Sequence, residues 1–160
     1  MFRNIEFWWI DVSTNMDLWA DIYDQVYFDV NDDIDFYVQE CIVSKGPVLE
    51  LGCGTGRITL PISKTGIDIL AVDNSMAMMK VALEKINRQD TAYRNLQFVG
   101  SDMRNFAFDE KFTLIIIPIR GFQSLLNVND QIETVTNIKN HLTENGRLIF
   151  NTFVPSYESM

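Results

Sequence analysis

Three alternating glycines mark the part of this chain that is best suited to chemistry. Gly52, Gly54 and Gly56 follow the apolar run Val48–Leu51, which contains a single acid, Glu50. Residues without a Cβ allow the backbone to approach a ligand closely, and a helix that begins after them points its free N–H groups at that ligand. The pattern therefore predicts a turn that holds a nucleotide.

The residues after the glycines argue against two common nucleotide sites. A dinucleotide site of the Gly-x-Gly-x-x-Gly type requires a glycine where Arg57 stands. A phosphate loop requires Lys followed by Ser or Thr, and Arg57-Ile58 occupies those positions. A strongly held triphosphate is therefore not expected.

Two aspartates follow later apolar runs. Asp73 lies 17 residues after Gly56, where an acid can accept hydrogen bonds from both ribose hydroxyls. The alternative role of Asp73 is to cap the helix that starts near Ser75. Asp102 could accept from an exocyclic adenine amine while the Met103 N–H donates to a ring nitrogen, or it could be a solvated loop residue.

Short β-branched runs alternate with amphipathic stretches, a pattern typical of a parallel sheet. We expect an α/β, Rossmann-like, doubly wound and mainly parallel sheet of about five strands with helices on both faces. The expected strands are 47–51, 67–72, 96–99, 112–118 and 147–153. The expected helices cover 15–43, 55–63, the stretch from Ser75 to 87 and the stretch from Asp130 to 142, with Asn145-Gly146 turning the chain into the last strand.

Ligands of such sheets bind at the carboxyl ends of the strands. This rule brings four segments to one rim, namely 50–56, 73–75, 101–104 and 118–123. We expect one domain, 1–160, with an N-terminal helical cap over 1–45 and an α/β core over 46–155, because 47% apolar residues suffice for one core.

Composition excludes several functions. The net charge is −9, and residues 1–45 hold ten of the 22 acids but only two of the 13 bases, which disfavours nucleic-acid binding. We interpret this acidic segment as a solvated helix face, with attraction of a cationic substrate as the alternative. With one histidine and no cluster of metal-ligating residues, we expect no metal site. The two separated cysteines predict a cytoplasmic protein. No apolar run is long enough to span a membrane.

Four segments in the same order and spacing resemble class I methyltransferases that use S-adenosylmethionine. The segments are 48–57, 69–79, 98–106 and 112–126, and 138–155 is similar to the family's closing helix, turn and strand, with Glu144-Asn145-Gly146 in place of Pro-Gly-Gly. The resemblance covers about 19–155 and implies S-adenosylmethionine as cofactor and a small molecule as methyl acceptor.

The resemblance also implies roles for single residues. Gly52 and Gly54 would contact the methionine part of the cofactor, with Glu50 orienting its amine. Asp73 would hold the ribose. The remaining implied cofactor contacts are Gly56 in the turn, Asn74 and Met78 against the adenine, Asp102 and Met103 at its edge, Pro118, and Tyr23 with Tyr27 as an aromatic lid. For Met78 we favour a place in the core, because it lies on the apolar face of a helix, and for the two tyrosines hydrophobic packing explains the spacing equally well.

Methyl transfer needs mainly the alignment of a nucleophile with the methyl carbon, so no catalytic dyad is expected. The candidates at the reacting end are Arg120, Gln123 and Tyr23, besides Ser124, which stands where related enzymes often have histidine. Arg120 could clamp the carboxylate of an acidic small molecule, or form a surface salt bridge.

The family usually continues past the fifth strand with a substrate-covering insertion and two more strands, one of them antiparallel. We expect these strands to be missing here, because the sequence given stops at Met160, and the alternative is that the chain is a fragment or a shortened relative. We therefore expect the edge of the fifth strand to be exposed, and hypothesise that two copies pair through it. Two other functions compete with methyl transfer. One is binding of S-adenosylmethionine or S-adenosylhomocysteine without turnover, and the other is aminopropyl transfer, which the lack of a second acidic pair disfavours.

Overall fold

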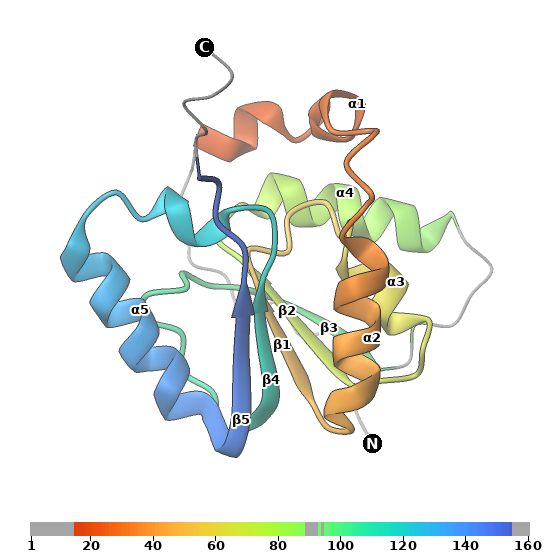
Figure 1. The fold of residues 1–160 in the computed structure, drawn as a ribbon. Helices are drawn as coiled ribbons and strands as arrows, with labels where there is room; N and C mark the ends of the chain where they lie inside the picture. Colours follow the sequence, from red (N-terminus) through yellow and green to blue (C-terminus); the bar gives the residue numbers. More distant parts are fainter. Residues whose placement is uncertain (1–14, 89–92, 94, 155–160) are drawn as a thin grey trace.

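The strands form a single five-stranded parallel sheet. The structure, a computed structural model, describes residues 15–88, 93 and 95–154. The sheet order is β3-β2-β1-β4-β5, and all four strand pairs are parallel (Figure 1). The strands are β1 (Val48–Leu51), β2 (Ile69–Asp73), β3 (Leu96–Gly100), β4 (Phe112–Ile117) and β5 (Leu142–Phe150). The predicted doubly wound α/β fold is confirmed.

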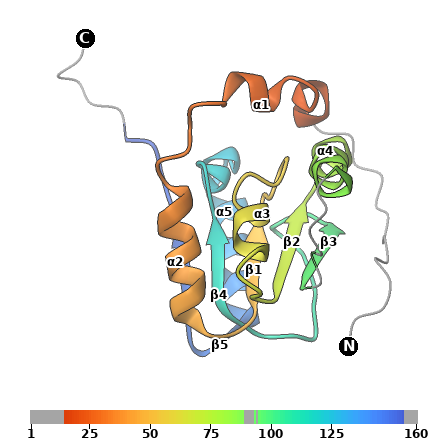
Figure 2. The same ribbon diagram turned by 90° about the vertical axis from the view of Figure 1, so that its right-hand side faces the viewer.

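Helices cover both faces of the sheet. The helical elements are η1 (Asn15–Trp19), α1 (Tyr23–Val26), α2 (Ile34–Ser44), α3 (Thr59–Ser63), α4 (Met76–Asn87), η2 (Gly121–Ser124) and α5 (Val128–His141). Helices α2, α3 and α4 lie on one side and α5 on the other, while η1 and α1 cross above the carboxyl ends of the strands (Figures 1 and 2).

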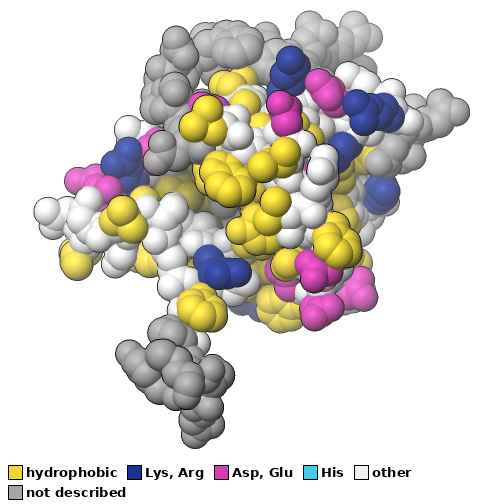
Figure 3. Space-filling view, turned by 90° about the horizontal axis from the view of Figure 1, so that it is seen from above, with side chains coloured by type: hydrophobic (Ala, Val, Ile, Leu, Met, Phe, Trp, Pro, Cys, Tyr) yellow, Lys and Arg dark blue, Asp and Glu magenta, His cyan; other side chains and the backbone are white. Residues whose placement is uncertain are grey.

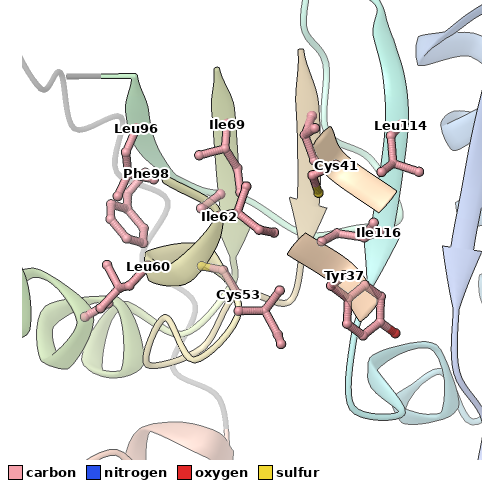
Figure 4. Packing of buried hydrophobic residues seen from close by; sticks show 14 of the residues in the cluster. Tyr37, Cys41, Cys53, Leu60, Ile62, Ile69, Leu96, Phe98, Leu114 and Ile116 are labelled. Atoms are coloured by element: carbon pink, nitrogen blue, oxygen red, sulfur yellow. The ribbon is translucent and has the colours of Figure 1, made fainter. Parts of the chain in front are cut away.

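The alternation of side chains along β1 divides the core into two layers. Val48 packs with residues of α2, α3 and α4, and Figure 4 shows this layer, in which Tyr37 and Cys41 of α2 approach Ile116 of β4. Leu49, the next residue, packs in the opposite layer with α5. Burial on both faces explains why the strands read as continuous apolar runs.

Two helices begin at other residues than predicted. Helix α3 starts at Thr59 rather than at residue 55, because Gly56 has φ +81°, which a right-handed helix excludes. Helix α5 is capped by Asn127, whose side chain accepts from the Asp130 N–H at 2.9 Å. Asp130 is therefore a first-turn residue and not the start of the helix.

The last strand differs most from its prediction of 147–153. Strand β5 begins at Leu142 and ends at Phe150, so Asn145-Gly146 lies inside the strand and is not a turn before it. Phe112 pairs with Leu142 whereas Leu114 pairs with Arg147, which places a bulge between them. A Cβ on Gly146 would lie 2.9 Å from the Phe112 carbonyl oxygen, so this glycine permits the close approach.

The N-terminal stretch predicted as helical over 15–43 is three short elements. The stretch is helical as predicted, but it is divided, because the chain turns at 27–33 and crosses the strand ends before α2 begins. Within the described residues no helix is long and apolar enough to cross a bilayer.

Candidate functional site

A cavity of about 370 Å³ opens at the carboxyl ends of β1, β2 and β4, beneath the N-terminal segment. In Figure 3, which looks onto this end of the molecule, hydrophobic side chains gather in the middle of the face and charged ones lie around them. The lining includes Met16, Tyr23, Tyr27, Glu50, Gly52, Gly54, Arg57, Asp73, Asn74, Met78, Ser101, Met103, Pro118, Ile119, Arg120, Gly121 and Ser124.

The glycine turn has the backbone geometry that only glycine adopts readily. Gly52, Gly54 and Gly56 have φ values of +77°, +54° and +81°. A Cβ on Gly52 would meet only the end of the Met103 side chain, at 3.8 Å, so the space above this residue is open to the cavity. The backbone is thus exposed where a ligand would lie against it. Gly56 does not line the cavity and instead packs against α4, where a Cβ would lie 3.1 Å from that of Ala82.

Asp73 ties the glycine turn to the end of β2. Its Oδ2 accepts from the Gly54 N–H at 2.7 Å, and its Oδ1 accepts from the Ser75 N–H at 2.7 Å. The helix cap of α4 is Ser75, whose Oγ accepts from the Met78 N–H. Burial raises the pKa of Asp73, while the backbone N–H bonds act in the opposite direction. The carboxylate therefore lies at the cavity wall and is not the cap of the helix.

Glu50 is the buried acid of the site, with 1% of its surface exposed. Its Oε2 accepts from the Thr59 hydroxyl at 2.7 Å. Burial raises the pKa of Glu50 to about 8, from an ordinary 4.5, although the Thr59 bond lowers it. A cationic ligand group beside this carboxylate would favour its ionised form.

The side chains of the segment after β3 point in different directions, some into the cavity and one away from it. Met103 and Ser101 line the cavity, but Asp102 does not. The Asp102 carboxylate instead accepts from Arg104, at 2.6 Å from Nη2 and 3.0 Å from Nε, and these bonds lower its pKa. The side chain predicted to read adenine is therefore engaged by its neighbour two residues away.

The loop after β4 is held in an unusual backbone conformation. Ile119 and Arg120 both have positive φ, +44° and +58°, which is rare for residues with a Cβ and rarer still for a β-branched one. The Arg120 N–H donates to Asn151 Oδ1 at 2.8 Å. Gln123, a predicted reacting-end residue, does not line the cavity, because its amide group bonds to the backbone N–H and C=O of Phe153.

Two tyrosines of the N-terminal segment line the cavity on one side. The rings of Tyr23 and Tyr27 lie 4.7 Å apart between centroids, which agrees with their predicted placement on one face. Burial is the largest cause that raises the pKa of Tyr23, so its phenol stays protonated. Burial also raises the pKa of the Cys53 thiol in the glycine turn, so that thiol is not a nucleophile at neutral pH.

Acidic residues of the N-terminal segment form hydrogen bonds with residues at the rim of the cavity. The sequence did not predict these bonds. The Ser75 hydroxyl donates to Asp17 at 2.5 Å, and the Thr55 hydroxyl donates to Asp24 at 2.6 Å. Asp24 also pairs with Lys85, at 2.5 Å between Oδ2 and Nζ. These bonds show a role at the rim that the interpretation as a solvated face did not include, although the Asp24 side chain is also 43% exposed.

A bidentate contact joins Asp33 to Arg57. The guanidinium donates to both carboxylate oxygens, at 2.5 and 2.9 Å, and to the Val30 carbonyl at 2.8 Å. Only 13% of the Arg57 side chain is exposed. Arg57 therefore serves the cap rather than a bound phosphate. No sequence signal pairs residues this far apart.

The described residues contain no group of three or more side chains suited to hold a metal ion. His141, the only histidine of the chain, bonds through its ring nitrogens to the Phe108 N–H and the Asn137 backbone carbonyl, away from the cavity. The cavity lining offers exposed backbone, the carboxylates of Glu50 and Asp73, and the guanidinium groups of Arg57 and Arg120, all of which can bind and align a ligand.

The parallel sheet, with a glycine turn after β1 and an acid at the end of β2, defines a Rossmann-like α/β protein. A family model described as "Methyltransferase domain" matches residues 48–146, and the chain belongs to this family. The resemblance to class I methyltransferases is thereby confirmed.

Individual proteins that are similar to this chain are also methyltransferases. A malonyl-[acyl-carrier protein] O-methyltransferase of Bacillus anthracis is 33% identical over 108 residues, which cover 66% of this chain and 37% of that protein. A crystal structure of an S-adenosylmethionine-dependent methyltransferase from Clostridium acetobutylicum matches with TM-score 0.69 and 26% identity, over 86% of this chain and 57% of that one.

A third match is the glycopeptide N-methyltransferase MtfA in complex with S-adenosylmethionine. Its TM-score is 0.62 at 25% identity, over 71% of this chain and 51% of that one. The chain spans less than half the length of the curated relatives it matches. These relatives differ in methyl acceptor, so the comparisons establish the family and not the substrate.

Proposed function

We propose that this chain binds S-adenosylmethionine in the rim cavity and transfers its methyl group to a small molecule. The observation that carries the proposal is the convergence of exposed glycine backbone, the Asp73 carboxylate and the buried Glu50 carboxylate on one cavity of about 370 Å³. The bound cofactor supplies an electrophilic methyl carbon on a positively charged sulfur. The residues of the chain bind the cofactor and align the acceptor with the methyl carbon.

The residues present fit this cofactor. Open space above Gly52 admits the methionine part, and Glu50 lies where a carboxylate can receive its ammonium group. Asp73 uses one acceptor site of each oxygen on a backbone N–H, so further lone pairs are free for ribose hydroxyls. Asn74, Met78 and Met103 border the space for the adenine, and Pro118 closes the side toward β4.

Two residues of the predicted cofactor site, Gly56 and Asp102, do not line the cavity. Tyr23 remains a candidate for the wall over the methyl group, because its ring lines the cavity. We propose that Gly56 and Asp102 act indirectly. Gly56 permits the packing of the turn on α4, and Asp102 fixes the chain beside Met103.

Calorimetric titration tests the proposal. S-adenosylmethionine and S-adenosylhomocysteine should both bind, and Asp73→Ala should cost about 1–3 kcal/mol of binding free energy through the loss of a charged acceptor. Asp109→Ala, at an exposed loop acid, is the control and should change nothing. Equal affinity of the Asp73 variant and the wild type would show that the acid serves only the turn.

Binding without turnover is the alternative function. Formation of S-adenosylhomocysteine in the presence of an acceptor separates the two, because a protein that only binds the cofactor releases none. We also propose a cytoplasmic location, which the two free buried cysteines support, and pairing of two copies through the outer edge of β5. A monomer mass by light scattering would contradict the pairing.

A further inference from the structure

The cavity has four charged side chains in its lining, and three of them are bonded within the protein. Glu50 accepts from a threonine hydroxyl, Asp73 accepts from two backbone N–H groups, and Arg57 pairs with Asp33. Among residues 15–88, 93 and 95–154, no acid forms a salt bridge with Arg120. Arg120 is thus a cation at the cavity whose charge is not neutralised by the described chain.

The loop that carries this cation is fixed from two sides. Ile119 and Arg120 adopt consecutive left-handed conformations, a strained arrangement that persists only when surrounding contacts hold it, and such strain concentrates at functional sites. Asn151 holds the Arg120 N–H, and the guanidinium lies 5.4 Å from the centre of the Phe153 ring. Gln123 holds the backbone of Phe153 through two hydrogen bonds.

The described lining offers no evident base for the methyl acceptor. It contains no histidine, and the buried Tyr23 phenol stays protonated. The Ser124 hydroxyl donates to the Gly121 carbonyl at 2.7 Å. Glu50 is 1% exposed, and the proposed function places it beside the ammonium group of the cofactor. An alcohol or ammonium acceptor would have to lose a proton, whereas a carboxylate is already an unprotonated nucleophile at neutral pH.

We propose that the methyl acceptor is a carboxylate held by the Arg120 guanidinium at the mouth of the cavity, an inference that rests on the proposed function. In the reaction a carboxylate oxygen forms a bond to the methyl carbon as the bond from that carbon to sulfur breaks. The anion and the sulfonium cation become a methyl ester and a neutral thioether. No proton is taken up or released, so a site without a base suffices.

The acidic segment does not oppose this assignment. Asp24 and Asp33 form ion pairs with Lys85 and Arg57, and Asp17 accepts from the Ser75 hydroxyl, so these three carboxylates are engaged at the rim. A planar guanidinium is also the side chain best matched to a carboxylate, because it donates two parallel hydrogen bonds. The geometry therefore favours an anionic acceptor in a chain of net charge −9.

The test measures binding in two steps. First, S-adenosylhomocysteine is titrated into the wild type, Arg120→Gln, Arg120→Lys and Arg88→Gln. Second, each saturated complex is titrated with straight-chain monocarboxylates and dicarboxylates of two to eight carbons, and with the primary amides and amines of the same lengths. Arg88 is the matched control because it is an exposed arginine at the end of α4, outside the cavity.

We expect Arg88→Gln to bind S-adenosylhomocysteine with the affinity of the wild type, and the Arg120 variants to bind it well enough to be saturated for the second titration. In the wild type and Arg88→Gln, the best carboxylate should bind at least tenfold more tightly than its amide, and Arg120→Gln should reduce this preference to within twofold. Arg120→Lys should retain part of it through its point charge. If Arg120→Gln does not fold, Arg120→Gly removes the cation at a backbone conformation that glycine adopts freely.

Other outcomes overturn the inference in different ways. Tighter binding of amines, a preference unaffected at Arg120, or no carboxylate binding at millimolar concentration would contradict a carboxylate acceptor while leaving the cofactor site intact. Failure of the wild type to bind S-adenosylhomocysteine would contradict the proposed function itself. The first titration therefore separates the two failures.

Discussion

The two sides of the cavity are built in different ways. On the cofactor side, backbone geometry and a short contact fix the wall, since the Gly54 N–H and the Asp73 carboxylate are 19 residues apart in sequence. On the cap side, three aspartates bond to rim residues 24 to 58 residues away. The cofactor wall is thus part of the sheet, whereas the cap is attached to it by side chains. We expect changes in the wall to affect folding and changes in the cap to affect closure.

The largest expected effect concerns the buried acid of the wall. Because burial raises the pKa of Glu50 to about 8 from 4.5, the native state retains a proton that the unfolded chain loses. The contribution of Glu50 to the free energy of unfolding should therefore be largest below pH 4.5. It should fall by about 3–5 kcal/mol as the pH rises to 8. Urea unfolding at pH 5, 6, 7 and 8 measures the slope.

Glu50→Gln is the matched control for this slope. The amide keeps an acceptor for the Thr59 hydroxyl but carries no titrating group. Its stability should change less between pH 5 and 8 and exceed that of the wild type at pH 8. Parallel slopes in the two proteins would show that Glu50 ionises in the folded state as it does in the unfolded one.

The next effect compares two glycines of similar backbone conformation. Gly56 and Gly66 have φ of +81° and +83°, but a Cβ on Gly56 would lie 3.1 Å from Ala82 and 3.2 Å from Leu60, whereas one on Gly66 would meet nothing within 4 Å. Gly66→Ala should cost about 1–2 kcal/mol through backbone strain alone. Gly56→Ala should cost about 2–4 kcal/mol, because crowding adds to the strain. Equal losses of unfolding free energy in the two variants would show that Ala82 and Leu60 move aside at no cost when a Cβ is added at Gly56.

The wall was largely predictable from the sequence and the cap was not. The glycine turn, Asp73 and the first four strands follow from local spacing and apolar runs, so their positions agreed with expectation to within two residues. The bulge in β5 could not be predicted, because Asn145-Gly146 has the composition of a turn and its place in the strand depends on pairing with Phe112.

Two side chains of the predicted site do not line the cavity, and the reason is again a contact that the sequence does not reveal. Asp102 and Gln123 lie in the expected loops, but each is engaged by a partner that spacing does not reveal, Arg104 in one case and the backbone of Phe153 in the other. The bonds of Asp17, Asp24 and Asp33 depend equally on tertiary structure. A loop position can thus be read from the sequence, whereas the direction of a polar side chain depends on its competing partners.

The third effect tests the attachment of the cap. Asp33→Asn removes one charge of a bidentate pair and leaves the Arg57 guanidinium, mostly buried, without its counter-ion. We expect a loss of about 1.5–3 kcal/mol in the free energy of unfolding, the range for hydrogen bonds to charged groups. Limited proteolysis should also cut the chain near Val30 more rapidly. Asp32→Asn, at the exposed neighbouring residue, should change neither measurement.

The smallest effect is expected at Asp24, and it defines how firmly the outer part of the cap is held. The side chains of Asp24 and Lys85 are 43% and 28% exposed, so their ion pair is screened by solvent. Asp24→Asn still accepts from the Thr55 hydroxyl and should cost about 0.5–1 kcal/mol, a difference that 1 M salt should reduce. Asp21→Asn, on the same exposed stretch, is the control. A loss as large as that of Asp33→Asn would mean that the cap is held along its whole length, and that its attachment is as much a part of the fold as the cofactor wall.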